Sequence, residues 1–222
     1  SPHRAPSPGI VEIAHAAVTT MLDKSIPYYH VIMVRPQGTP FEQSPLPEGF
    51  RFSSFQTGDE LAWAAIETSV GEFDDVATSV EYFSREYLPF ADELKRRLVF
   101  VENSAGEKVA TATAWWSPRN ETTVPSLHWI ATRPEYQGLG LGKAVVGQAL
   151  EKSIQLDGDR DNFLHTQTWS YTAVGISMRM GFRILVNGSF AGFENDYHQA
   201  KPHLEAKLIE KFPVEEYSLP QI

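Results

Sequence analysis

Residues 127–143 read LHWIATRPEYQGLGLGK, and this stretch decides the fold of the chain. Its apolar beginning, residues 127–132, predicts a strand, and Gly138, Gly140 and Gly142 lead from that strand into a helix. Glycine lets the backbone approach a ligand closely, and the first N–H groups of a helix have no intrahelical partner. Because the start of a helix also carries a partial positive charge, the stretch predicts a phosphate-bearing cofactor.

Two better-known glycine loops do not fit this spacing. A P-loop requires glycine where this chain has Gln137 and a hydroxyl where it has Ala144. The dinucleotide fingerprint requires glycine or alanine at the positions of Lys143 and Val145. The loop therefore disfavours nucleotide hydrolysis and dinucleotide binding.

The remaining pattern, Gln137-x-x-Gly140-x-Gly142, resembles the pyrophosphate-binding motif of the GNAT superfamily of N-acetyltransferases. Upstream, residues 130–136 are similar to the strand-to-loop sequence of that family, and residues 173–182 resemble its later helix, which ends in Gly-Phe. The resemblance implies an α/β fold of three layers, with a central mixed, mostly antiparallel sheet flanked by helices. It also implies acetyl-CoA as the cosubstrate.

The hydrophobic pattern predicts an order of elements that agrees with this fold. We expect strands at residues 30–34, 50–55, 98–102, 109–116, 127–132, 163–169 and 182–185, and helices after 57–60, at 76–87, after the glycine loop up to 157, at 171–180 and within 202–211. The strand at 30–34 is expected outside the catalytic core. The first helix is expected to bury Leu61, Ala65, Ile66 and Phe73, and the last one Leu204 and Leu208.

Three segments follow from this order. Residues 1–49 form an N-terminal extension with a flexible tail and one strand, residues 50–186 form a GNAT-like acetyltransferase domain, and residues 187–222 form a C-terminal extension that packs on the domain. Met21 is a candidate for the original start, and the sequence leaves open whether residues 1–20 are native.

Composition limits the classes of partner. The 222 residues include 28 acidic and 19 basic side chains, a formal charge of -9, so nucleic acid is not an expected partner. There is no cysteine, which excludes disulfides and thiol nucleophiles, and we expect no metal, because His198 and His203 are poorly spaced for ligands. No apolar run reaches the roughly 18 residues of a membrane span. The absence of cysteine fits a reducing cytoplasm, where we expect the protein. A homodimer is left open.

The resemblance places acetyl-CoA against one loop and one strand end. Its pyrophosphate side would lie at Gln137, Gly138, Gly140, Gly142 and Lys143, and its thioester carbonyl would face main-chain N–H groups of Ile130 and Thr132.

The base that accepts the amine proton is predicted to be His128, which lies on the strand before the loop and has an ordinary pKa of roughly 6.5. Some family members carry a catalytic carboxylate on this strand, where this chain has Ser126. The alternative for His128 is a structural role, with a hydrogen bond to the neighbouring strand. His165 on the following strand is the second choice, and its alternative is also structural.

The acid that protonates the CoA thiolate is where this chain departs from the family. Many members place a tyrosine four residues before the Gly-Phe pair, but this chain has Ser177 there. An aliphatic hydroxyl is a far weaker acid than a phenol, whose pKa is roughly 10. Ser177 is therefore a doubtful catalytic residue, and either water or another group would protonate the thiolate.

The sequence predicts an N-acetyltransferase that moves an acetyl group from acetyl-CoA to a primary amine of a small-molecule or peptide acceptor. The alternative is a domain that binds acyl-CoA as a sensor or scaffold without turnover, which Ser177 would permit.

Overall fold

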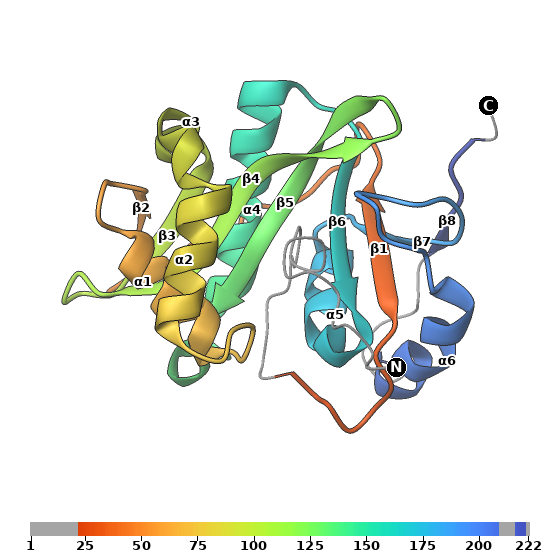
Figure 1. Cartoon of the computed structure of the whole chain (residues 1–222), viewed down its shortest axis with the longest axis horizontal. Helices are drawn as coiled ribbons and strands as arrows, with labels where there is room; N and C mark the ends of the chain where they lie inside the picture. Colours follow the sequence, from red (N-terminus) through yellow and green to blue (C-terminus); the bar gives the residue numbers. More distant parts are fainter. Residues whose placement is uncertain (1–21, 209–215, 221–222) are drawn as a thin grey trace, which may run out of the picture.

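The computed structural model describes residues 22–208 and 216–220, and its centre is one eight-stranded sheet. The strands are β1 (His30–Arg35), β2 (Arg51–Ser54), β3 (Leu98–Glu102), β4 (Lys108–Arg119), β5 (Thr122–Thr132), β6 (Asn162–Gln167), β7 (Arg183–Leu185) and β8 (Glu216–Tyr217). They lie in the order β2-β3-β4-β5-β6-β1-β7-β8 (Figure 1). The β5–β6 and β7–β8 pairs are parallel and the others are antiparallel, so the predicted mixed, mostly antiparallel sheet is confirmed.

Helices cover both faces of the sheet, as predicted (Figure 1). They are α1 (Glu60–Ser69), α2 (Val76–Glu86), α3 (Ala91–Arg97), α4 (Leu141–Asp157), α5 (Tyr171–Arg179) and α6 (Tyr197–Leu208), with 3-10 turns at Leu88–Phe90, Pro134–Tyr136 and Thr168–Ser170. Along β3, Val99 and Val101 enter the apolar cluster shared with α4, α5 and α6, whereas Leu98 and Phe100 enter the cluster shared with α1 and α2. Because alternate residues of a strand point to opposite faces, the two clusters are separate layers of core.

Strand β1 lies inside the sheet, not outside the core as the sequence predicted. It pairs with β6 on one side and with β7 on the other, and all its residues after His30 are buried. The 126 residues between β1 and β6 in the sequence, 36–161, hide this pairing from any local pattern. The segment before β2 therefore contributes an interior strand to the same sheet as the glycine-loop strand.

The buried face of helix α1 agrees only in part with the prediction. Ile66 is buried as predicted, and so is Phe73, which lies beyond the end of the helix, whereas Leu61 is 61% exposed. The other buried residues of α1 are Trp63, Ala64 and Glu67. The edge-to-face packing of Trp63 against a ring from β5, Trp129, fixes this orientation, with ring centroids 5.6 Å apart. This orientation carries a carboxyl, Glu67, into the protein interior.

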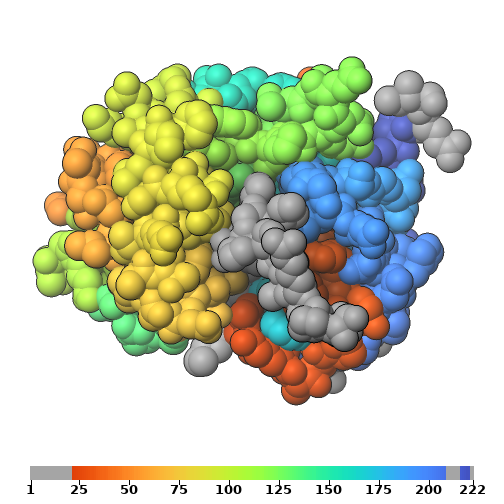
Figure 2. All heavy atoms as spheres, in the orientation of Figure 1, coloured from red at the N-terminus to blue at the C-terminus, as the bar shows by residue number. Residues whose placement is uncertain are grey.

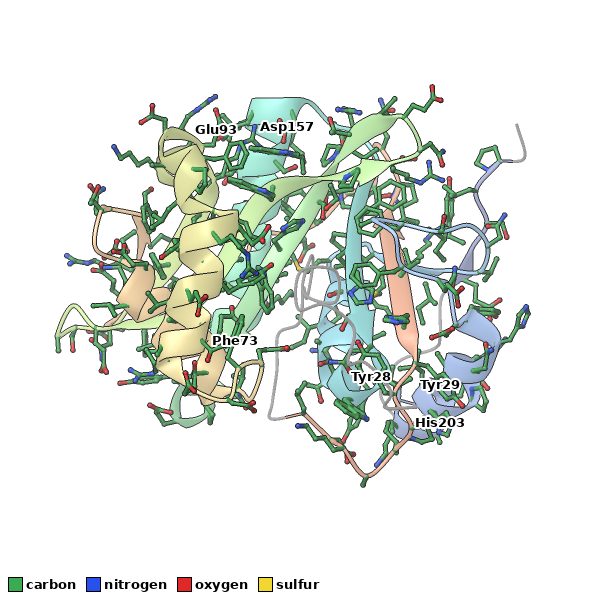
Figure 3. All side chains as sticks on the ribbon, viewed as in Figure 1. Tyr28, Tyr29, Phe73, Glu93, Asp157 and His203 are labelled. Atoms are coloured by element: carbon green, nitrogen blue, oxygen red, sulfur yellow. The ribbon has the colours of Figure 1, made fainter. Side chains whose placement is uncertain are left out.

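Two further contacts join segments that are distant in the sequence. The Arg97 guanidinium at the end of α3 donates two hydrogen bonds of 2.8 Å to Asp157 at the end of α4 and one to Glu93 (Figure 3). At the other end of the molecule Tyr29 stacks on His203 of α6, which buries Leu204 and Leu208 as predicted (Figure 3). Helix α6 begins earlier than predicted and continues through Pro202.

No helix among the described residues combines the length and apolar character needed to cross a bilayer.

Candidate active site

The sheet opens between β5 and β6. Within residues 22–208 these parallel strands share one ladder pair, Ser126 with Phe163, and diverge after it. Just beyond that pair β5 carries a bulge, because Ala112 of β4 faces both Trp129 and Ile130, and Trp129 has a φ of 48°. The bulge turns β5 away from β6, so the backbone on this side of β5 is not used by the sheet.

The glycine loop closes the end of β5. Gly138 and Gly140 have φ values of 81° and 83°, a left-handed conformation that side chains rarely adopt, and Gly140 is the residue at which α4 begins. The Gln137 side chain donates a hydrogen bond of 3.0 Å to the Thr132 carbonyl and so holds the loop against the strand. The first N–H groups of α4 are therefore presented beside the strand end.

A cavity of about 360 Å³ lies against this loop, and most of the predicted cofactor residues line it. Its walls are Thr132, Tyr136, Gln137, Gly138, Gly140, Leu141, Gly142, Lys143, Thr172, Ile176 and Arg179. Ile130 is not among them, and its side chain lies in the core. The Thr132 hydroxyl is buried and has no hydrogen-bond partner in the described part of the chain.

Helix α5 supplies a wall of the cavity that was not predicted from the sequence. Thr172, Ile176 and Arg179 are four and three residues apart, which places them on one side of a helix. This spacing is the feature of the sequence from which the wall could have been predicted. Arg179 and Lys143 also border a neighbouring cavity of about 310 Å³ with Phe41, so two cations lie between the two spaces.

His128 lies on β5 at the start of the opening and is buried among hydrogen-bonding side chains. Its Nδ1 lies 2.7 Å from the Tyr87 hydroxyl and its Nε2 lies 2.8 Å from the Ser117 hydroxyl on β4. Burial lowers the pKa of His128 to about 3, so the imidazole is neutral. The bond to Ser117 is the contact with a neighbouring strand that a structural role requires, and Tyr87 is a partner that the sequence did not reveal.

His165 and Ser177 lie elsewhere. His165 on β6 is buried, stacks on Phe193 with 3.6 Å between ring centroids, and has its Nε2 2.8 Å from Nδ1 of His30. Ser177 is buried on α5, and its carbonyl accepts the Phe182 N–H at 3.1 Å where the helix ends. Its side chain is not part of the cavity wall, so the structure brings neither residue together with His128 and the loop.

Glu67 is a further buried group that the sequence did not single out. It is 1% exposed, and its Oε1 has no hydrogen-bond partner among the described residues. Burial, and next the charge of Glu72, raise the pKa of Glu67 well above its usual range. In residues 22–208 and 216–220, no three His, Asp or Glu side chains are placed to share a metal ion.

Comparisons with known proteins agree with this geometry. The model of the acetyltransferase (GNAT) family matches residues 60–182. No curated protein matches the chain.

Solved structures of low sequence identity share the fold. A GCN5-related N-acetyltransferase from Sphaerobacter thermophilus is 17% identical with a TM-score of 0.55, over 70% of this chain and 48% of that one. A GNAT-family acetyltransferase from Colwellia psychrerythraea is 12% identical with a TM-score of 0.53, over 72% of this chain and 54% of that one. The glucosamine N-acetyltransferase region of a fungal multi-domain GH3 β-N-acetylglucosaminidase is 10% identical with a TM-score of 0.51, over 73% and 20%.

The chain thus spans about half or less of the length of these proteins. At such identities the likeness is one of fold, whereas the family model covers more than half of the 222 residues and includes the glycine loop. Because this family model matches, and because the sheet opens beside the glycine loop, the chain belongs to the GNAT acetyltransferase family.

Proposed function

We propose that the protein transfers an acetyl group from acetyl-CoA to a primary amine in a direct ternary complex. The observation that carries the proposal is the cavity at the end of β5, where two left-handed glycines and the start of α4 meet Lys143 and Arg179. Oriented backbone N–H groups and two cations suit a pyrophosphate, which is a polyanion.

The residues present fit this cosubstrate in three ways. The glycines leave open space where a Cβ would stand at positions 138 and 140, so the backbone is accessible to a ligand. The Thr132 hydroxyl lines the cavity without a partner and is able to donate or accept one hydrogen bond. The apolar side of the cavity, with Leu141 and Ile176, suits the alkyl part of the pantetheine arm.

The carbonyl of the thioester would be polarised by backbone of β5. After Ser126 the strand has left its parallel partner, so N–H groups near Ile130 and Thr132 are available to a developing oxyanion. Each well-placed donor of this kind contributes roughly 3–4 kcal/mol to catalysis. Acetyl-CoA supplies the activated acyl group when bound.

The reaction forms a C–N bond and breaks the C–S bond, and the thiolate leaves with the electron pair. The attacking nitrogen must lose a proton. Because the pKa of His128 is about 3, its imidazole does not keep a proton near neutral pH, so we propose that His128 passes the proton on to solvent. Both ring nitrogens have hydroxyl partners, so the proton would pass through Tyr87 or Ser117. Solvent then protonates the thiolate, since a free thiol has a pKa of roughly 8.5 and the Ser177 side chain does not line the cavity.

The second candidate is an acyl-CoA-binding domain without turnover. It is favoured by the place of Ser177, which leaves α5 without an acid at the cavity. Release of free thiol from acetyl-CoA in the presence of a panel of primary amines separates the candidates. Amine-dependent release supports the transferase, whereas CoA binding with no release from any amine supports the sensor.

Arg179→Ala is expected to weaken CoA binding about ten- to a hundredfold, because a hydrogen-bonded ion pair with a phosphate contributes roughly 1.5–3 kcal/mol. Calorimetric titration of CoA into the variant measures the loss. The matched control is Arg160→Ala, since Arg160 is exposed and lines a different cavity, and it should leave the affinity unchanged. Equal affinities for both variants would remove Arg179 from the site.

A further inference from the structure

A separate cavity of about 310 Å³ lies where the connection between α1 and α2 meets the end of β6. The connection contributes Glu72 and Asp74, the segment before β1 contributes Lys24 and Tyr28, and the end of β6 contributes Gln167 and Trp169. The cavity therefore lies between two halves of the molecule, one on the β5 side and one on the β6 side of the point where these strands diverge. In Figure 2 these halves are the orange-to-yellow surface that includes α1 and α2 and the red-orange, cyan and blue surface opposite it.

This cavity lies at the same end of the diverging strands as the proposed acetyl-CoA site. Gln167 is the last residue of β6, and Thr132, the last residue of β5, lines the acetyl-CoA cavity. Phe73, between the two acidic wall residues, packs on the bulged Trp129 with 5.3 Å between ring centroids. Figure 3 shows Phe73 and Tyr28 at this end, one from each half.

The walls are electronegative. Two carboxylates, Glu72 and Asp74, face one ammonium, Lys24. Burial, then the charges of Glu72 and Asp196, raise the pKa of Tyr28 to about 12. The buried carboxyl of Glu67 adds no charge here, because burial raises its pKa well above the usual range. Among the described residues, the charged side chains that line the cavity are therefore two carboxylates and one ammonium, a balance that favours a cationic ligand.

The cavity already contains one ammonium group, that of Lys24. The Lys24 Nζ lies 5.4 Å from the centroid of the Trp169 ring, within cation–π distance. An aromatic face beside carboxylates is the arrangement that binds amines and disfavours carboxylate ligands.

We propose that the acceptor is a small amine that carries a second cationic group, and that this cavity binds the second group while the first amine is acetylated. The inference rests on the proposed function and adds the class of acceptor to it. The reacting amine loses its proton before attack, so the recognition charge must be the other one.

The test compares three acceptors of equal length: diaminobutane, aminobutanol and aminobutanoate, which differ only in the charge of the far group. With acetyl-CoA saturating, kcat/KM should fall in that order, with about tenfold or more between the first and the last. Equal values for the three acceptors would overturn the proposal while leaving the acetyltransferase intact.

Two variants of the cavity wall, which should change the acceptor preference in opposite directions, test whether the effect arises at this cavity. Glu72→Gln should reduce the preference for diaminobutane over aminobutanol by about two- to fivefold, the range for one partly exposed ion pair. Lys24→Gln removes a repelling charge and should increase the same preference. Glu81→Gln, an exposed carboxyl on α2 outside the cavity wall, is the control and should leave it unchanged. A preference that neither Glu72→Gln nor Lys24→Gln alters would refute the site.

Binding is also measurable without turnover. Tetramethylated diaminobutane is a dication near neutral pH, but once a nitrogen loses its proton no hydrogen is left to be replaced by an acetyl group. Calorimetry should detect its binding to the wild-type protein and weaker binding to Glu72→Gln. Absence of binding to the wild type would overturn the proposal whether or not any amine is acetylated. Absence of thiol release with all amines, alongside intact binding of this dication, would instead count against the proposed function.

Discussion

Gly140→Val is expected to abolish the stabilisation of the protein by acetyl-CoA. For the wild type, ligand at 100 times its dissociation constant adds roughly 2.7 kcal/mol to the free energy of unfolding. Gly140 has a φ of 83° at the residue where α4 begins, and a β-branched side chain strongly disfavours that conformation. The backbone N–H groups at the start of α4 would therefore lose their arrangement, with a loss of more than a hundredfold in affinity. Thermal unfolding with and without ligand measures the effect.

The control is a glycine with the same strain in a different place. Gly106 in the β3–β4 turn has a φ of 79°, and at both positions nothing lies within 4 Å of an added Cβ. Gly106→Val and Gly140→Val should therefore lose similar stability without ligand, roughly 1–3 kcal/mol, but only the second should lose the response to acetyl-CoA. A folded Gly140→Val protein with a wild-type response would show that the loop is not the binding site.

His128→Gln is expected to remove a large part of the acid sensitivity of folding. The pKa of His128 is about 3 in the folded protein and about 6.5 for an ordinary histidine. Between these pH values the unfolded chain binds a proton that the folded protein does not, so the free energy of unfolding falls as the pH falls. The contribution is fully present above pH 6.5, and roughly 3–5 kcal/mol is lost by pH 3.

Urea unfolding at a series of pH values tests this prediction, by the difference in the free energy of unfolding between wild type and variant. His198→Gln on the surface of α6 controls for the loss of an imidazole. If wild type and His128→Gln lost stability in parallel below pH 6.5, His128 would not be a buried neutral base. The same low pKa means that a change of reaction rate with pH near neutrality would report the titration of another group, such as the acceptor amine.

The parts of this protein that the sequence predicts are those in which the signal is local. The turn from β5 to α4 is encoded by Gly138 and Gly140, whose left-handed φ values other residues avoid, and the stop after α4 by Gly158. The β3–β4 hairpin likewise follows from a turn of a few residues around Gly106. The family motif sits within these local signals, which is why the fold and the cofactor loop follow from it.

The parts that the sequence does not predict depend on contacts between distant segments. Strand β1 takes its place because β6, far along the chain, offers it the edge opposite the one that faces β5. The rotation of α1 is decided by Trp63 against Trp129, since Leu61 alone would favour another face. His128 looks like an accessible base in the sequence, but Tyr87, 41 residues away, buries it. The cavity between Lys24 and Glu72 is of the same long-range kind.

Hydrogen exchange of backbone amides on addition of acetyl-CoA tests most directly the claim that the cosubstrate lies at the glycine loop. Protection is expected at the amides of residues 138–144 and at the end of β5, with little change in α1 and α2, because the proposed ligand contacts are made by that backbone. Protection confined to another part of the molecule, or none at saturating acetyl-CoA, would contradict the account.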